Sequence, residues 1–195
     1  MARTSTIGFV WLAVAATGTG FAFLSPTDSK VMGQLPAQVT QTLAHTPVSL
    51  PAGLPSERTL ALVTFHRNQR SQADSWIEGM NLHNDTAISW IRIPVLSDPD
   101  TPDGRSKGEK RLLERYTAEA ERTKMHPMFM NKSEFAKATG LSSIEKAYAV
   151  VLNRQGEVLA RVEGAFDADR AQTLLTLLQM GLHAPDTGHQ GRQAS

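Results

Sequence analysis

Cysteine is absent from this sequence of 195 residues. Its absence excludes thiol redox chemistry, disulfide bonds, iron–sulfur clusters, thiolate zinc sites and covalent haem attachment. Neither sign of charge dominates the sequence, because 19 aspartates and glutamates nearly balance 20 lysines and arginines. A net charge of +1 gives no strong overall field for nucleic acid or anionic lipid. The chain does have a hydrophobic fraction of 41%, which is enough to bury a core and excludes a wholly disordered protein.

Charged residues are also missing from the longest apolar run, Ile7–Leu24, which follows the single charged side chain of Arg3. A basic start followed by an apolar run and small residues is typical of a secretory signal. The run has 18 residues, at the lower edge of the roughly 17–25 that span a bilayer. Residues 1–24 are therefore predicted to be a signal peptide or a membrane anchor. Either one places the rest of the chain outside the cytosol, most simply in a bacterial periplasm.

Residues 25–57 lack a long apolar period and contain five prolines. They are predicted to form an extended lead-in with short strands near Gln38–Leu43 and Val48–Leu50. At the other end, residues 183–195 have almost no apolar side chains, and we expect a disordered tail. Residues 58–182 carry the apolar patterns of one folded domain.

Four short runs rich in apolar and β-branched residues predict strands in this domain. They are Thr59–Phe65, Ala87–Val95, Lys146–Asn153 and Val158–Val162. A helix pattern separates the first two strands, which favours parallel neighbours, and the short turn between the last two favours an antiparallel hairpin. The fold class is therefore α/β, with a central mixed sheet and helices on both faces.

Capping residues mark three of the predicted helices. Ser71 is predicted to cap the helix after the first strand. A short helix is predicted to begin at Ser133 and to end at Gly140, and Asp167 is predicted to cap a last helix that Gly181 closes.

Residues 97–131 are predicted to be an insertion into the domain. The insertion starts with a turn-rich loop, Ser97–Lys107, and continues as a surface helix, Glu109–Arg122, which has few large apolar residues. Basic residues between Arg105 and Lys124 are interleaved with four glutamates, a pattern typical of a solvated face rather than a nucleic-acid groove. No nucleic-acid partner is expected.

The element order and three local sequences resemble the thioredoxin-like superfamily, in particular its redoxin branch. The residues that carry the resemblance are Gly33–Pro36 with Pro47–Leu50 in the lead-in, the strand Leu60–Phe65 that runs into a helix, and the closing stretch Ala147–Leu178. The resemblance covers residues 33–181. It implies a thioredoxin-like three-layer sandwich for residues 58–182.

The chain departs from this superfamily at the redox site. Family enzymes carry a reactive cysteine where the first strand turns into its helix, because a helix N-terminus lowers the thiol pKa. Gln69 and Gln72 occupy the two cysteine places here. The family also places a cis-proline before its third strand, where this chain has the proline-free stretch Ser142–Lys146. Carboxamides cannot exchange disulfides or reduce peroxides, so we expect a redox-inactive protein that is not an enzyme and holds no cofactor.

A second resemblance is to the mitochondrial ATP-synthase assembly factor family. It is carried by Phe65–Arg67, the pair Ser75 and Trp76, and the ending Gly156–Val158 with Arg161–Gly164. That family combines a thioredoxin-like fold with a chaperone role. The resemblance implies that the chain holds a protein partner.

His66, Arg67 and Arg70 are candidate contact residues. They lie at the predicted N-terminus of the helix after the first strand, where free amides favour anions. We expect them to contact an anion or a partner, and the alternative is a plain polar helix cap.

A second candidate site holds three thioethers and one imidazole within six residues. Its members are Met125, His126, Met128 and Met130. Soft ligands of this kind suit Cu(I), whereas methionines at alternate positions also fill gaps in a core.

These features predict a non-catalytic thioredoxin-like binding or assembly-factor module that acts outside the cytosol on a protein partner. Membrane contact comes through Ile7–Leu24 if that segment is not cleaved. The alternative function is copper binding or transport through Met125–Met130.

Overall fold

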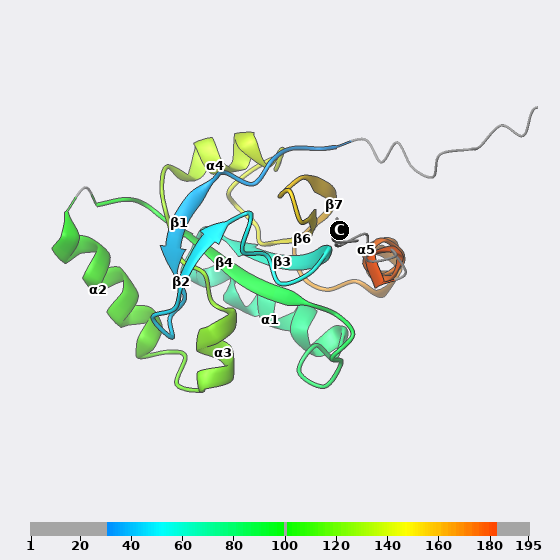
Figure 1. Ribbon diagram of the computed structural model, residues 1–195, viewed down its shortest axis with the longest axis horizontal. Coiled ribbons are helices and arrows are strands. Elements are labelled where there is room, and N and C mark those ends of the chain that lie inside the picture. The colour runs from blue at the N-terminus through cyan, green and yellow to red at the C-terminus, as the bar shows by residue number, and fades with distance from the viewer. Residues whose placement is uncertain (1–30, 100, 183–195) are drawn as a thin grey trace, which may run out of the picture.

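A five-stranded sheet forms the centre of the molecule (Figure 1). The computed structural model describes residues 31–99 and 101–182, so the predicted signal or anchor at 1–24 and the predicted tail at 183–195 lie outside the described residues. The strand order across the sheet is β5-β4-β3-β6-β7. The strands are β3 (Arg58–Thr64), β4 (Trp90–Leu96), β5 (Met128–Phe129), β6 (Tyr148–Asn153) and β7 (Val158–Glu163).

Strand pairing confirms the predicted mixed sheet. β3 runs parallel to β4, with Leu60 opposite Trp90, and antiparallel to β6, which forms the predicted hairpin with β7. The strand predicted from Ala87 begins only at Trp90, because the Ala87 backbone N–H bonds to a carboxylate instead of a strand. The sequence did not predict β5, which pairs with the end of β4 through Met128 and Val95. Two residues are too few to show a strand period.

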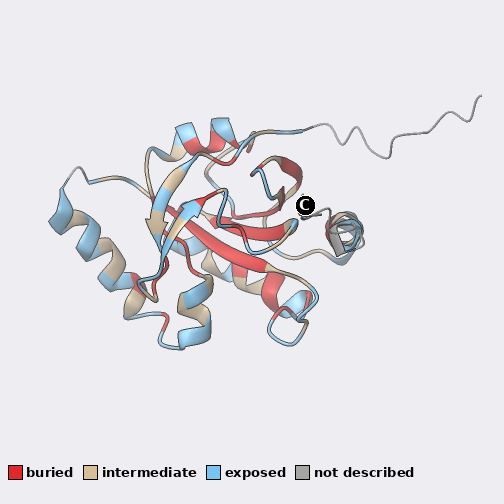
Figure 2. Cartoon of the chain, viewed as in Figure 1, coloured by how far each residue is buried: buried red, intermediate tan, exposed pale blue. Residues whose placement is uncertain are grey.

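Each face of the sheet carries its own core. Leu60 and Leu62 of β3 pack on one face, which α1 and α5 cover. Ala61 and Val63 pack on the other face, with α4 and the lead-in. Figure 2 shows the buried residues along β3 and β4, and exposed residues on the outer sides of the helices. The helices are α1 (Arg70–Gly79), α4 (Lys132–Ala138) and α5 (Ala168–Leu182). This arrangement confirms the α/β three-layer sandwich.

The lead-in contributes to the core. β1 (Gln38–Gln41) and β2 (Pro47–Leu50) form a separate antiparallel two-stranded sheet. Leu35, Leu50 and Leu54 are at most 5% exposed and pack among residues of β3, β4 and β6. The described lead-in is therefore anchored on the domain and is not a detached extension.

The insertion holds two helices where one was predicted. They are α2 (Pro102–Leu113) and α3 (Glu119–Lys124). The predicted loop Ser97–Lys107 is wrong, because α2 begins inside it. Thr101 Oγ1 accepts a hydrogen bond from Gly104 N (3.2 Å), and proline suits the first helical position that follows.

The predicted helix Glu109–Arg122 is wrong as well, because it breaks between α2 and α3. Tyr116 turns inward at the break and is 7% exposed. Arg122 Nε donates to the Tyr116 carbonyl (2.7 Å), and Arg122 Nη2 donates to the Leu113 carbonyl (3.3 Å). One side chain thus satisfies carbonyls that end α2.

Three predicted helix ends also differ. α4 begins at Lys132 and not at Ser133, because Asn131 is the cap and its Oδ1 accepts hydrogen bonds from Ser133 N and Glu134 N. Ser71 does not cap α1, because a 3-10 turn, η1 (Arg67–Gln69), precedes the helix and Gln69 takes the cap position. Asp167 does cap α5, since Asp167 Oδ1 accepts a hydrogen bond from Arg170 N (3.0 Å). Gly181 does not close α5, which continues to Leu182. Glycine ends a helix where it adopts a left-handed conformation, not merely by being present.

Candidate functional site

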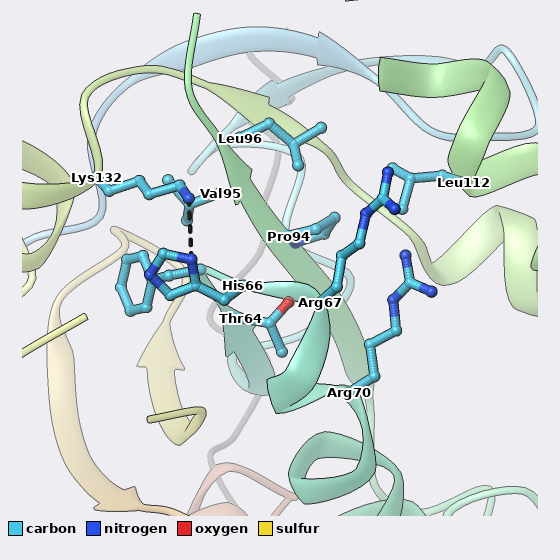
Figure 3. A pocket seen from close by; sticks show the side chains of 10 residues that line it. Thr64, His66, Arg67, Arg70, Pro94, Val95, Leu96, Leu112 and Lys132 are labelled. Carbon is cyan, nitrogen blue, oxygen red and sulfur yellow. Dashed lines mark hydrogen bonds between the residues drawn. The ribbon is translucent and has the colours of Figure 1, made fainter. Parts of the chain in front are cut away.

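A hollow of about 220 Å³ lies where β3 and β4 end and η1 begins. Its lining residues are Thr64, Phe65, His66, Arg67, Arg70, Pro94, Val95, Leu96, Leu112 and Lys132. Figure 3 shows His66 and Lys132 on one side of the hollow, and both arginines on the other. The carboxyl ends of parallel strands are the usual place for ligands in α/β sheets. The sequence-predicted residues His66, Arg67 and Arg70 are therefore brought together in one cavity.

The positive charge in this hollow is not paired with an acid in the described part of the chain. Arg67, Arg70 and Lys132 form no ion pair within residues 31–99 and 101–182. No aspartate or glutamate of the described chain lines the hollow. Lys132 Nζ lies 3.5 Å from His66 Nδ1, so the imidazole and the ammonium group meet at one side of the hollow. An anion that enters the hollow meets several donors and no repelling carboxylate.

The acid that would normally neutralise Arg70 is engaged elsewhere. Asp74 lies one helical turn beyond Arg70, at the spacing of a helix ion pair. Its Oδ1 instead lies 2.7 Å from Arg92 Nη2, on the buried side chain of β4. The ring of Tyr116 lies beneath both guanidinium groups, 5.9 Å from Arg70 and 5.3 Å from Arg92. Arg70 is thereby held beside the hollow with its charge unpaired.

Gln69 lies between two lining residues, Arg67 and Arg70, and its side chain joins two loops. Its side chain is 2% exposed. Gln69 Oε1 accepts hydrogen bonds from Phe65 N (2.7 Å) and His66 N (3.2 Å). Gln69 Nε2 donates to the Ile144 carbonyl (2.7 Å), which lies 75 residues further along the chain. The carboxamide therefore fixes the turn from β3 into η1 against the loop before β6.

Gln72 makes a second connection to the same loop. Gln72 Oε1 accepts a hydrogen bond from Ala147 N (2.9 Å). Both glutamines that were predicted at the cysteine places thus bind backbone groups within or next to the stretch Ser142–Lys146. Both carboxamides therefore make internal hydrogen bonds that connect the start of α1 to this loop.

The Met125–Met130 segment is divided between two packed clusters. Met125 is 1% exposed and packs with Leu43 of the lead-in and Leu112 of α2. Met128 is fully buried in the core on the α4 side of the sheet, and Met130 packs against that core. These thioethers fill gaps between elements. Within the described residues, no group of three or more histidines, aspartates and glutamates is arranged to hold a metal ion.

His126 of the same segment is a buried polar residue. It is 6% exposed, and its backbone N–H bonds to the Arg92 carbonyl (2.8 Å). Burial lowers the pKa of His126 from 6.5 to about 4. The imidazole is therefore neutral at pH 7.

Lys132 is the residue of the hollow that sequence reasoning missed. It opens α4 after Asn131, whose Oδ1 accepts hydrogen bonds from the first turn of that helix. Lys132 lies 66 residues from His66 in sequence. No local pattern links two residues so far apart, and the position became visible only once α4 was placed beside β4.

None of the helices in the described part of the chain is both long and apolar enough to span a bilayer. Sequence comparison matches no protein-family model and no curated protein.

Solved structures do resemble this chain. One is BsSco, a member of the Sco family of cytochrome c oxidase assembly proteins: it is 15% identical, with a TM-score of 0.51 over 76% of this chain and 95% of that chain. A second, a protein assigned to electron transport from Aquifex aeolicus VF5, is 12% identical, with a TM-score of 0.55 over 77% of this chain and 99% of that chain. A third, the C-terminal domain of a protein assigned as a thiol-disulfide oxidoreductase from Bacteroides thetaiotaomicron, is 13% identical, with a TM-score of 0.50 over 79% and 99% of the two chains. The chain therefore has a thioredoxin-like, redoxin-type fold in a sequence that contains no cysteine.

Proposed function

We propose that this protein is a non-catalytic thioredoxin-like binding module that acts outside the cytosol as an assembly factor for a partner protein. The observation that carries the proposal is the use of Gln69 and Gln72. Both carboxamides are committed to backbone groups of the protein itself, at Phe65, Ile144 and Ala147. In this proposal, the two glutamines at the predicted cysteine positions support the backbone around the hollow. Such a support suits a surface that binds a ligand.

The residues that line the hollow indicate which kind of ligand it binds. Arg67, Arg70 and Lys132 offer donors for carboxylates, and the arginines can bind them through two parallel hydrogen bonds. Phe65, Val95 and Leu96 add apolar surface to the lining. An acidic peptide segment with a neighbouring apolar side chain matches this combination. We infer that the partner docks such a segment at the hollow.

The proposed location rests on the apolar run Ile7–Leu24 and on the kind of protein that shares the fold. BsSco, one of the similar structures, belongs to a family of cytochrome c oxidase assembly proteins. That role is a property of BsSco. It supports the proposal by showing that a protein with this fold can serve assembly.

The partner surface can be tested with a defined acidic probe. A fluorescein-labelled peptide of ten glutamates should bind the full chain, and a peptide of ten glutamines should not. Replacing Arg67 and Arg70 together by glutamate should weaken binding at least about tenfold, because attraction becomes repulsion. Fluorescence anisotropy at low and at physiological salt measures both peptides.

The matched control reverses two other exposed basic residues, Lys107 and Arg111 of α2, which do not line the hollow. This control should bind the acidic peptide like the unaltered protein. Equal losses in both double variants would show that net charge governs binding, and would reject the hollow as the partner surface.

The absence of catalysis has its own test. Purified protein should reduce neither insulin disulfides nor peroxide above the buffer rate. Turnover that disappears on replacing Gln69 by alanine would overturn the proposal of a non-catalytic module.

Copper binding through Met125, His126, Met128 and Met130 is the alternative from the sequence. No contact in the structure favours a copper site, since Met125 and Met128 pack in two separate hydrophobic clusters. A Cu(I) titration against a competing chelator decides between the functions. Tight binding that is lost when all four residues are replaced would favour the copper function.

A further inference from the structure

A second, larger cavity lies away from the cationic hollow, at the other end of β4. Its volume is about 430 Å³, within the range of small-molecule sites. The lead-in residues that line it are Thr42, Thr46, Val48, Gly53 and Pro55, and the others are Ser89, Trp90, Ile91, Thr123, Lys124 and His126. Figure 1 shows the β1–β2 sheet crossing in front of β4, with its connecting loop near α3. A hydrogen bond from Leu43 N to the Met125 carbonyl (3.1 Å) fixes the lead-in beside the end of α3.

Lys124 provides the cation in this cavity. Its Nζ lies 4.8 Å from the centre of the Trp90 ring, so the indole face holds the ammonium beside the cavity. Burial lowers the pKa of Lys124 from its usual value of 10.5. No aspartate or glutamate of the described chain is among the lining residues. An incoming anion would therefore relieve the cost of partly burying this charge.

His126 provides a polar group without a partner. The residue is 94% buried, since only 6% of it is exposed, and its Nδ1 has no hydrogen-bond partner among residues 31–99 and 101–182. Buried polar atoms are nearly always hydrogen-bonded, and an exception calls for a specific explanation. The ring lines the cavity and is neutral at pH 7. A neutral imidazole can both donate and accept, and it does not add a second charge to the site.

The rest of the lining is apolar or hydroxylated. Val48, Pro55, Trp90 and Ile91 supply apolar surface, and hydroxyl groups come from threonines and Ser89. A mainly apolar cavity with few convergent polar groups is the general form of a small-molecule site. A cavity that has one cation and a mainly apolar lining favours a ligand with one negative charge and an apolar body.

We propose that this cavity binds an amphipathic monoanion, namely a small carboxylate with an apolar tail, with its carboxylate at Lys124 and its tail against Val48, Pro55 and Ile91. The site stands apart from the cationic hollow, shares no lining residue with it and does not depend on the proposed function.

Decanoate below its micelle concentration is the probe, titrated by calorimetry into the full chain at pH 7. Decanoate should bind at a site whose affinity depends on Lys124, whereas decyltrimethylammonium, with a similar tail and the opposite charge, should not bind there. Replacing Lys124 by methionine should weaken decanoate binding about tenfold or more, because a charge-assisted hydrogen bond is lost. The matched control is Lys132→Met, which removes a cation from the other hollow and should leave decanoate affinity unchanged.

A second variant distinguishes loss of decanoate binding from loss of folding. Thr46 is exposed at the cavity edge, and Thr46→Phe should obstruct the cavity and abolish decanoate binding without disturbing the core. Far-UV circular dichroism and urea unfolding check that each variant is folded. Equal decanoate affinity in the unaltered protein, Lys124→Met and Thr46→Phe would overturn the proposal, and so would tight binding of decyltrimethylammonium. Neither outcome bears on the acidic-peptide surface, which the double variant of Arg67 and Arg70 tests separately.

Discussion

At the scale of single residues, Gln69 and Gln72 each connect the start of α1 to the loop before β6. A carboxamide has one acceptor and two donors on one planar group, so it can join backbone groups from two loops. Gln69 uses both ends in this way, with Phe65 and His66 on one side and Ile144 on the other. A cysteine thiol cannot make this connection, because sulfur is a weak donor and a weak acceptor.

The first prediction compares the two glutamines. Gln69→Met keeps the size of the side chain but leaves buried backbone groups of Phe65 and Ile144 without partners, and should lower the free energy of unfolding by about 2–4 kcal/mol. Gln72→Met loses one hydrogen bond, to Ala147 N, at a half-buried position and should cost about 1 kcal/mol. Urea unfolding at pH 7 measures both. Equal costs for the two variants would contradict the special role of Gln69.

The second prediction concerns pH and His126. The folded state holds the His126 pKa at about 4, below the usual 6.5, so the unfolded chain binds more protons between these values. Stability from this residue is therefore complete above pH 6.5, falls as the pH drops, and stops falling near pH 4. A pKa difference of this size corresponds to about 3 kcal/mol.

Carboxylates also titrate in this range, so the measurement is a difference between two proteins. Urea unfolding at pH 7, 5.5 and 4.5 should show a steeper loss in the unaltered protein than in His126→Gln. Parallel pH profiles would mean that the imidazole of His126 titrates normally in the folded state.

At the scale of elements, four of the five strands of the sheet were predictable, and β5 and the helices of the insertion were not. The runs at β3, β4 and β6 are short, mainly apolar and buried on both faces, so composition alone marks them, whereas β7 is buried only in its first half and was marked by the turn that precedes it. In the insertion, Leu112 and Tyr116 lie four residues apart and both are buried, which gives the period of one continuous helix. The break between α2 and α3 depends on Arg122, whose contacts with α2 exist only after the chain folds back.

The same reasoning explains how much of the candidate site the sequence revealed. Gln69, Gln72 and the basic residues beside them follow directly after a strand, so their shared location was predictable. Lys132 enters the hollow from a helix far along the chain, and Lys124 reaches its cavity only because the lead-in folds over β4. Such contacts depend on tertiary packing, which a local pattern does not encode.

The third prediction tests the link between α2 and α3. Arg122→Met removes the hydrogen bonds to the Tyr116 and Leu113 carbonyls, and should destabilise the protein by about 1 kcal/mol. Amide hydrogen exchange should accelerate in the last turn of α2 while β3 stays protected. The control is Arg111→Met at an exposed position of α2, which should leave exchange unchanged. Acceleration that spreads equally through the sheet would indicate that Arg122 supports the whole fold.

At the scale of the whole molecule, the lead-in is the element that connects the Lys124 cavity to the core. Its strands cover one face of the sheet and form one wall of the Lys124 cavity. Its leucines are buried with residues of β3, β4 and β6, so unfolding the lead-in should expose core surface. We therefore expect the lead-in and the sheet to unfold together.

The fourth prediction tests this cooperativity with two positions of the β1–β2 sheet. Leu50 is 3% exposed, and Leu50→Ala should lower the free energy of unfolding by about 2–4 kcal/mol, because a buried methyl pair and its packing are lost. Val39 is 75% exposed, and Val39→Ala in the partner strand should change it by less than about 0.5 kcal/mol. Tryptophan fluorescence and far-UV circular dichroism should follow one shared transition in urea. A separate early transition in Leu50→Ala, with an unchanged main transition, would show instead that the lead-in unfolds alone, because its leucines then add nothing to the cooperative core.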